Sequence, residues 1–180
     1  MVHKNRVGVT TSLEHCHKEV LKKSQQLLQF LVNLRYEGKV SLGRNIKSIA
    51  EILKFFQKTL LPHMDLDERI LFPFVATHIP RLSPAIKIFK IDHREFKSNL
   101  RSFIVLFEQL KNAKTENRRF EIIEQLKEKG TYLMCLLRHH VRAESEQIHK
   151  AADEDLHLVE KNFILREIKK VCKKHDPLRN

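Results

Sequence analysis

The chain has 180 residues, of which 42% are hydrophobic, and its formal net charge is +12. This length suits one domain with a sizeable core, and the hydrophobic content excludes disorder of the chain as a whole. Only four glycines and five prolines occur, and alternating β-branched runs are few, which favours long helices over a sheet.

The cysteines and the terminal sequence indicate the compartment. Three cysteines are widely spaced and form no Cys-x-x-Cys motif, which is typical of free thiols in a reducing compartment. No apolar run is long enough to span a membrane, and the N-terminus lacks the apolar core of a signal peptide. We therefore expect a cytoplasmic protein with no membrane partner.

The positive charge has two interpretations. It could serve an acidic partner, nucleic acid or an anionic membrane surface. The basic residues are scattered over every segment and form no patch interleaved with aromatic residues, which favours a solvated surface. Nucleic acid is thus the less favoured partner, and the sequence leaves it open.

Two helices are expected in the first half. Thr11-Ser12-Leu13-Glu14 fits a capping box, so the first helix should begin there and end near Tyr36. The second should run from about Leu42 to about Phe74. Pro62 lies inside it and removes one backbone hydrogen bond, which predicts a kink. Pro73 and Pro80 should end this helix.

The second half predicts two more long helices and a short one. Ser83-Pro84 begins the third, with serine at the cap and proline in the first turn. After a polar turn at 112–115, the fourth should span 116–150. A basic fifth helix follows from Asp153. The third helix should bury one stripe: Ile86, Phe89, His93, Phe96, Leu100, Phe103, Phe107 and Leu110. The fifth has an apolar face of Leu156, Val159, Phe163, Ile164, Ile168 and Val171.

Long helices joined by short turns predict an all-α protein. Residues 11–150 should form an up-down-up-down four-helix bundle. Residues 151–180 should add a basic C-terminal helix that packs on the bundle or on a partner.

Polar residues interrupt the predicted apolar stripes in a repeated way. His63 and Asp67 lie four apart on the second helix, and His140 and Glu144 repeat this pair on the fourth. A buried histidine and carboxylate are costly unless something satisfies them. In an antiparallel bundle, His17, near the start of the first helix, and His93, near the start of the third, should reach the same depth. The spans from His17 to His63 and from His93 to His140 are also nearly equal, as in a duplicated hairpin.

Four imidazoles and two carboxylates meeting in a bundle core fit a pair of first-row metal ions. Imidazole suits iron, zinc, copper or nickel, and carboxylates favour iron and manganese. A carboxylate has two oxygens, so Asp67 and Glu144 are natural bridges between two ions, each holding two histidines. The predicted metal ligands are His17, His63, Asp67, His93, His140 and Glu144.

Simpler interpretations exist for each residue. His17 and His93 taken singly could be satisfied core histidines, and His63 and His140 could form ion pairs with the acids four residues on. Glu68 competes with Asp67, although it points about 100° away on a helix, and His139 competes with His140. His15, His78, His149 and His157 should lie on the surface. Packing is the expected role of Cys135 and Tyr132.

The pattern resembles the hemerythrin-like (HHE cation-binding) family over roughly residues 12–150. The matching stretches are His17-Lys-Glu-Val-Leu, His63-Met-Asp-Leu-Asp67-Glu-Arg-Ile-Leu-Phe-Pro73, Ile-Asp-His93-Arg-Glu-Phe and His140-Val-Arg-Ala-Glu144. The resemblance implies a four-helix bundle with a non-haem di-iron centre, bridged by two carboxylates and an oxo or hydroxo group.

Three positions depart from the family pattern. Lys97 replaces a second third-helix histidine of the oxygen carriers, Ser145 stands where they have aspartate, and Asp67 replaces the usual glutamate. The resemblance then implies a branch with four histidines and more open coordination positions. We expect a module that binds oxygen or nitric oxide for sensing, storage or transport. The alternatives are a di-iron enzyme that handles nitric oxide or peroxide or repairs iron centres, and a metal-free basic interaction bundle.

Overall fold

A computed structural model describes residues 9–36 and 38–174, with side chains at 16–36 and 41–167. This part of the chain is helical and contains no strand, so the all-α prediction is confirmed. The α-helices are α1 (Val9–Tyr36), α2 (Gly38–Phe55), α3 (Leu61–Leu66), α4 (Phe72–His78), α5 (Ser83–Lys111), α6 (Glu116–Glu144), α7 (Lys150–Asp155) and α8 (Leu158–Lys174).

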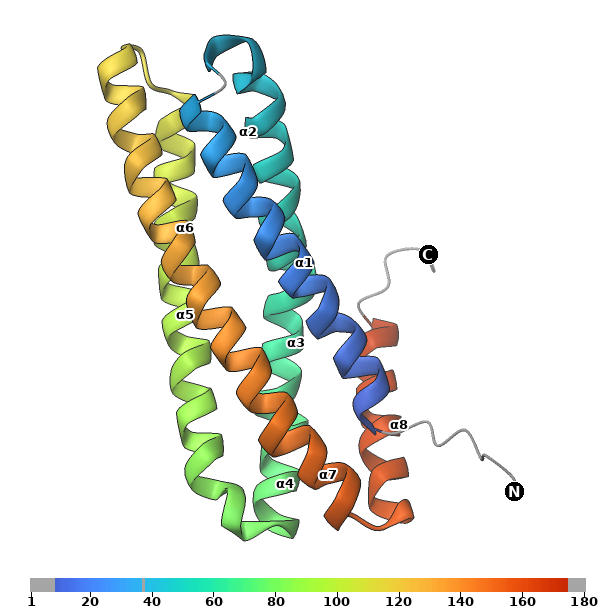
Figure 1. The fold of residues 1–180 in the computed structure, drawn as a ribbon. Helices are drawn as coiled ribbons and strands as arrows, with labels where there is room; N and C mark the ends of the chain where they lie inside the picture. Colours follow the sequence, from blue (N-terminus) through green and yellow to red (C-terminus); the bar gives the residue numbers. More distant parts are fainter. Residues whose placement is uncertain (1–8, 37, 175–180) are drawn as a thin grey trace, which may run out of the picture.

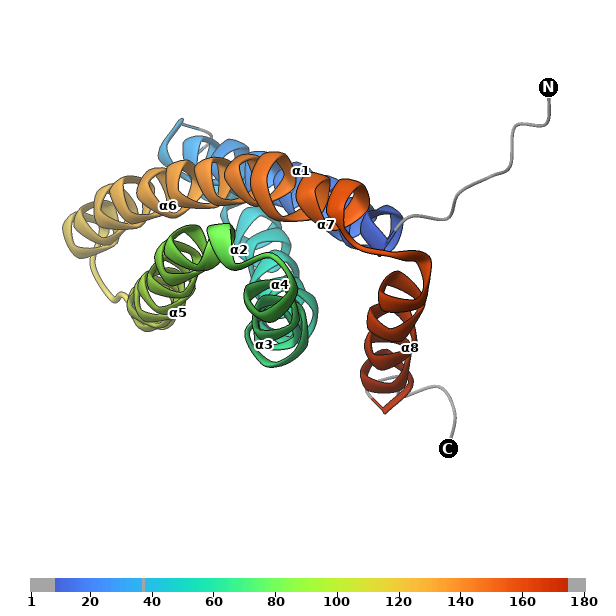
Figure 2. The same ribbon diagram turned by 90° about the horizontal axis from the view of Figure 1, so that it is seen from below.

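The helices form four antiparallel rods (Figure 1). The first rod is α1, the second is the continuous run of α2, α3 and α4, the third is α5, and the fourth is α6 with α7. Successive rods run in opposite directions, which gives the predicted up-down-up-down order. Helix α8 lies beside one end of the bundle, near the start of α1 (Figure 2).

Most predicted boundaries lie within a few residues of the observed ones. Helix α1 begins at Val9, two residues before the predicted capping box, whose side chains lie outside the described ones. Pro73 does not end the second rod, which continues to His78. Ser83 is not the cap of α5, because the cap position is Leu82 at the end of the 3₁₀ turn Pro80–Leu82.

The second rod contains two π turns, and a proline stands two residues after the last residue of each. At Phe56–Leu60 the Leu61 N–H bonds to the Phe56 carbonyl, and Pro62 follows. At Asp67–Leu71 the Phe72 N–H bonds to the Asp67 carbonyl, and Pro73 follows. A proline ring clashes with the carbonyl four residues earlier in a regular helix, and a wider turn relieves that clash. The predicted distortion at Pro62 therefore takes the form of a π turn.

A π turn adds one residue to a helical turn and so moves the buried stripe. Beyond Asp67, regular spacing predicts that Leu71 and Phe74 point inward. Leu71 is buried, but Phe72 is buried beside it and Phe74 is only half-buried. A third π turn, Ser145–His149, interrupts the fourth rod without a proline and buries both Ile148 and His149. All three π turns lie in the rods that carry the predicted metal ligands.

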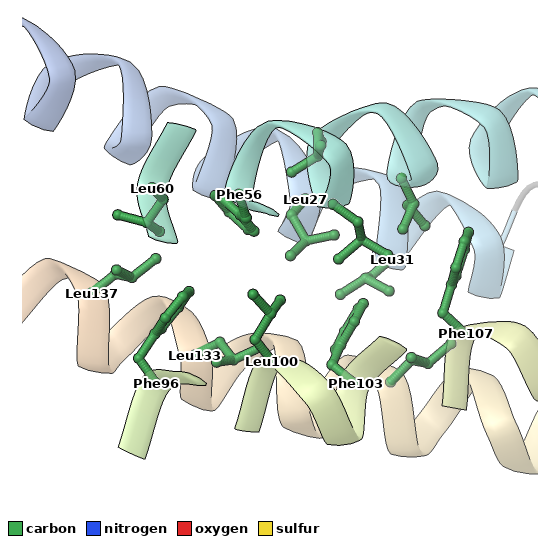
Figure 3. Close-up of a cluster of buried hydrophobic side chains, with 14 of the residues drawn as sticks. Leu27, Leu31, Phe56, Leu60, Phe96, Leu100, Phe103, Phe107, Leu133 and Leu137 are labelled. Atoms are coloured by element: carbon green, nitrogen blue, oxygen red, sulfur yellow. The ribbon is translucent and has the colours of Figure 1, made fainter. Parts of the chain in front are cut away.

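The apolar interior has two parts. The larger is built from leucines and phenylalanines of all four rods, whose side chains meet between the helices (Figure 3). The predicted stripe of α5 is confirmed, because all eight of its residues are buried. A smaller cluster includes Phe72, Phe89 and Ile164 at the other end of the bundle. The predicted metal ligands lie in neither cluster.

Helices α1 and α6 approach closely at Gly130. A Cβ atom there would lie 2.4 Å from Cδ1 of Leu31 and 3.4 Å from Cε2 of Phe103. The first distance is far below van der Waals contact, so glycine permits this approach. The absence of a side chain at Gly130 thus allows α1 and α6 to pack closely.

Helix α8 packs against α1 and the π turn Asp67–Leu71. Ile164 is fully buried, and Phe163 stacks on Phe74 with ring centroids 5.5 Å apart. Val159, predicted for the apolar face, is instead 80% exposed in the first turn of α8. The side chains of Ile168 and Val171 lie outside the described ones. None of the described helices combines the length and the apolar character needed to cross a bilayer.

Candidate metal centre

Six polar side chains from all four rods meet inside the bundle. His17 comes from α1, His63 and Asp67 from the second rod, His93 from α5, and His140 and Glu144 from the end of α6. His17, Asp67, His93, His140 and Glu144 are buried. The His63 side chain is 8% exposed. The sequence therefore placed these side chains at one depth, and their role as metal ligands stays a prediction.

The four imidazoles form two pairs through the same ring nitrogen. The Nε2 atoms of His17 and His63 lie 3.1 Å apart, and those of His93 and His140 lie 3.0 Å apart. Two nitrogens bound at right angles to one ion, each about 2.1 Å away, would lie about 3.0 Å apart. Each pair thus has the spacing of two ligands to one first-row metal ion.

Glu144 connects the two imidazole pairs. Its Oε2 atom lies 3.2 Å from Nε2 of His17 and 3.4 Å from Nε2 of His140. Asp67 contacts one pair only, with Oδ2 3.3 Å from Nε2 of His63. The carboxylate of Glu144 therefore spans both pairs, whereas the shorter Asp67 reaches the His63 side.

The two carboxylates are fully buried, and their pKa values move in opposite directions. Burial, together with repulsion from Glu144, raises the pKa of Asp67 well above its usual range. For Glu144, burial acts in the same sense, but contacts with His140 and His17 hold its pKa well below the usual range. Neither oxygen of Asp67 meets a hydrogen-bond donor among the described residues. A buried carboxylate in that position needs a proton or a cation.

The pKa values of the histidines also move in opposite directions. Burial lowers the pKa of His63 to about 3 and, with His140 nearby, lowers that of His93 to about 4. Burial also opposes charge on His140, but its contacts with Asp92 and Glu144 raise its pKa to about 9. His63 is therefore a neutral imidazole at pH 7, the form that binds metal, and it leaves Asp67 without a positive partner.

The outward ring nitrogens have partners that the sequence analysis did not assign. Nδ1 of His93 lies 3.0 Å from Oε1 of Glu68, and Nδ1 of His140 lies 3.3 Å from Oδ2 of Asp92. Nδ1 of His17 lies 3.3 Å from Oγ of Ser145. Metal-binding histidines commonly donate their second N–H to such acceptors, which fixes the tautomer. An acid next to a predicted ligand, at Glu68 and Asp92, is the signal that could have identified them.

His149 is not a surface residue, contrary to the sequence-based expectation. It is 2% exposed and stacks on His17, with ring centroids 5.0 Å apart and planes 12° from parallel. The π turn explains the difference. On a regular helix, a residue five positions after Glu144 would point about 140° away, but the wider turn brings it inward.

The other expectations for histidines and redox residues have separate outcomes. His78 and His157 are exposed, as expected, and the His15 side chain lies outside the described ones. His139, the alternative to His140, is exposed as well, whereas His140 is buried. Cys135 is exposed rather than packed. Tyr132 is 45% exposed, and its hydroxyl donates to Glu95.

The donor set fits a metal site. His17, His63 and Glu144 present one donor atom each within 4.8 Å of one another. Buried imidazoles and fully buried carboxylates form the mixed nitrogen and oxygen set that suits iron and its neighbours. These six residues would hold the ions, and a cation would neutralise the two fully buried carboxylates, Asp67 and Glu144.

An antiparallel helical bundle with histidines and carboxylates in its interior is typical of one class of cation-binding proteins. The sequence model of the hemerythrin HHE cation binding domain matches residues 9–152, more than half of the chain. The chain therefore belongs to the hemerythrin HHE cation-binding family, and the predicted resemblance is confirmed. Comparison with curated proteins gives no match.

Proposed function

We propose that this chain binds two non-haem iron ions and, through them, a diatomic ligand such as oxygen or nitric oxide. The observation that carries the proposal is the pairing of four Nε2 atoms at 3.0 and 3.1 Å, with one Glu144 oxygen in reach of both pairs. Ferrous iron in such a site supplies an open coordination position for a diatomic molecule. Family membership supports cation binding, and the choice of iron follows from the mixed donor set.

Apolar rings keep bulk water from the site. Phe72 is fully buried and stacks on His93 with centroids 5.6 Å apart, and Phe89 meets His140 edge-on at 5.5 Å. These rings restrict the imidazoles as well as excluding water. A site of this kind favours a small uncharged ligand over a large polar substrate, which supports a binding or sensing role.

The test begins with metal content and spectra. Protein expressed with added iron should contain two iron ions per chain, and the reduced protein should change its ultraviolet–visible spectrum reversibly when oxygen or nitric oxide is added and removed. His63→Ala should lower the iron content, whereas His139→Ala, at an exposed neighbour of His140, should not. The proposal would be contradicted if the unaltered protein contained no iron and His63→Ala had the same melting temperature. The metal-free interaction bundle would then be the better interpretation.

The same experiment separates binding from catalysis. Reversible uptake without loss of the gas supports a binding module. Continuous consumption of nitric oxide or peroxide by the iron-loaded protein, abolished in His63→Ala, would instead identify an enzyme.

Asp67 offers a sharper test of the bridging role. Its carboxylate reaches only the His63 side, so Asp67→Glu adds the methylene that would extend it toward the second imidazole pair. We expect slower iron loss to a chelator from Asp67→Glu than from the unaltered chain. An unchanged rate would argue that Asp67 is not a ligand.

A further inference from the structure

We propose that Glu68 and Asp92 make the two metal positions unequal, so that the His93–His140 pair holds its ion more tightly than the His17–His63 pair. The inference rests on the dinuclear site proposed above. It concerns two carboxylates outside the predicted ligand set, and it assigns them a positioning role.

Both histidines of one pair have a carboxylate behind them. Oε1 of Glu68 lies 3.0 Å from Nδ1 of His93, and Oδ2 of Asp92 lies 3.3 Å from Nδ1 of His140. When Nε2 faces a metal, Nδ1 carries the proton, and this N–H donates a hydrogen bond to the acceptor. A negatively charged acceptor fixes the ring and makes its inner nitrogen a stronger electron donor.

The carboxylate of Glu68 is itself held in place. Nζ of Lys97 lies 3.2 Å from Oε1 of Glu68 and 2.7 Å from Oδ1 of Asp65. The Glu68 side chain is 28% exposed and that of Asp92 is 25% exposed, so water screens both charges only in part. Lys97 thus anchors the acceptor behind His93. Among the described residues, its ion pairs are with Glu68 and Asp65 and not with a histidine.

The partners of the other pair are different. Nδ1 of His17 faces the hydroxyl of Ser145 at 3.3 Å, and its ring stacks on His149. Among the described side chains, the carboxylates within ion-pair distance of His17 and His63 are Glu144 and Asp67, and both contacts are made through Nε2. Among the side chains that the structure describes, no carboxylate lies within ion-pair distance of the outward ring nitrogens of His17 and His63, in contrast to those of His93 and His140.

The difference has a measurable consequence. Loss of one partner behind a metal-binding histidine typically lowers metal affinity by about 10–100-fold. Two charged partners on one pair, against a hydroxyl and a stacked ring on the other, should separate the two binding steps. We expect the tighter step to have an affinity at least about tenfold higher than the looser one.

Cobalt(II) is a suitable probe because its visible absorption reports the ligands of each ion. Metal-free protein titrated with cobalt in competition with a chelator should bind two ions in two resolved steps. His93→Ala should remove the tighter step, and His63→Ala should remove the looser one. The opposite assignment, or two steps of equal affinity, would overturn the inference.

Conservative variants isolate the carboxylates. Glu68→Gln and Asp92→Asn each keep the shape and remove the charge, so each should weaken the tighter step by about 10–100-fold and leave the looser step unchanged. Asp65→Asn is the matched control, because Asp65 shares Lys97 with Glu68 but contacts no histidine. Circular dichroism should show equal helix content in all three variants.

The failure of this inference can be distinguished from failure of the proposed function. Two bound ions with equal affinities, or tighter binding that survives both Glu68→Gln and Asp92→Asn, would overturn the inference and leave the dinuclear site standing. Fewer than two bound ions in the unaltered protein would overturn the dinuclear function and this inference together.

Discussion

The large apolar cluster and the layer of buried polar side chains lie in the same four rods, but they bury different kinds of side chain. In the cluster, the four rods bury mainly leucine and phenylalanine, and the π turn Phe56–Leu60 contributes two of these side chains. In the polar layer, four imidazoles and two carboxylates are buried together, and π turns change the helical spacing. The comparison indicates that the cluster stabilises the fold, whereas the polar layer costs stability until a cation binds.

The largest effect on stability should come from the apolar cluster. Phe103 is fully buried, and Phe103→Ala should lower the free energy of unfolding by about 3–5 kcal/mol through lost contacts and a cavity. Chemical denaturation of the metal-free protein measures this. Val105→Ala, at a 57% exposed position of the same helix, should change it by less than about 0.5 kcal/mol. Equal losses in the two variants would contradict the conclusion that the buried apolar cluster stabilises the fold.

The polar layer should show its effect when metal is added. An ion present at 100 times its dissociation constant should raise the free energy of unfolding by about 2.7 kcal/mol. His63→Ala should lose much of this gain, while Phe103→Ala should keep it. Thermal unfolding with and without iron under anaerobic conditions gives the comparison. A gain of equal size in His63→Ala would show that the metal binds elsewhere.

Acidity provides a third test. The pKa of His140 is raised to about 9, so its charged form stabilises the metal-free fold below pH 6.5, and that contribution is lost as pH rises toward 9. The raised pKa of Asp67 acts in the same direction. Metal-free protein should therefore lose stability, on the order of 2 kcal/mol, between pH 7 and pH 9.

A comparison of the metal-free and iron-loaded forms identifies the source of this pH dependence. Iron-loaded protein should show a smaller loss over the same range, because the ion replaces the proton at the site. Denaturant midpoints at several pH values measure both forms. Stability of the metal-free protein that rises from pH 7 to pH 9 would contradict the assignment.

The smallest effect should come from His149. Its stack on His17 is worth about 0.5–1.5 kcal/mol. His149→Phe keeps an aromatic ring and should retain iron nearly as well as the unaltered chain, whereas His149→Ala should release it faster to a chelator. Equal release from both variants would show that the stack does not hold His17 in place.

Regular helices were predictable because only their spacing matters. All eight predicted core positions of α5 are buried, including His93. The prediction was wrong where the spacing changes. After Asp67 it favoured Phe74 over Phe72, and after Glu144 it left His149 on the surface. Proline marks the first of these π turns in the sequence, but nothing in the residue pattern marks the turn at Ser145–His149.

The meeting of the six polar side chains followed from helix direction and depth, and the sequence supplies both. The partners at Nδ1 did not follow in the same way. The helical spacing places Glu68 about 100° away from Asp67, and this correctly keeps Glu68 away from the inward Nε2 atoms of the histidines. The same spacing gave no indication that Glu68 reaches an outward Nδ1 atom. A carboxylate that points away from a site can still reach the far side of a ring on the neighbouring helix, as Glu68 does with His93.

The close approach at Gly130 reaches the site through the spacing of two antiparallel helices. Fourteen residues separate Gly130 from Glu144 on α6, and fourteen separate Leu31 from His17 on α1. At about 1.5 Å per residue, both intervals measure about 21 Å. The two helices therefore stay in step from the Leu31–Gly130 contact to the His17–Glu144 contact. The absence of a side chain at Gly130 therefore contributes to the distance between α1 and α6 at His17 and Glu144, two of the predicted metal ligands.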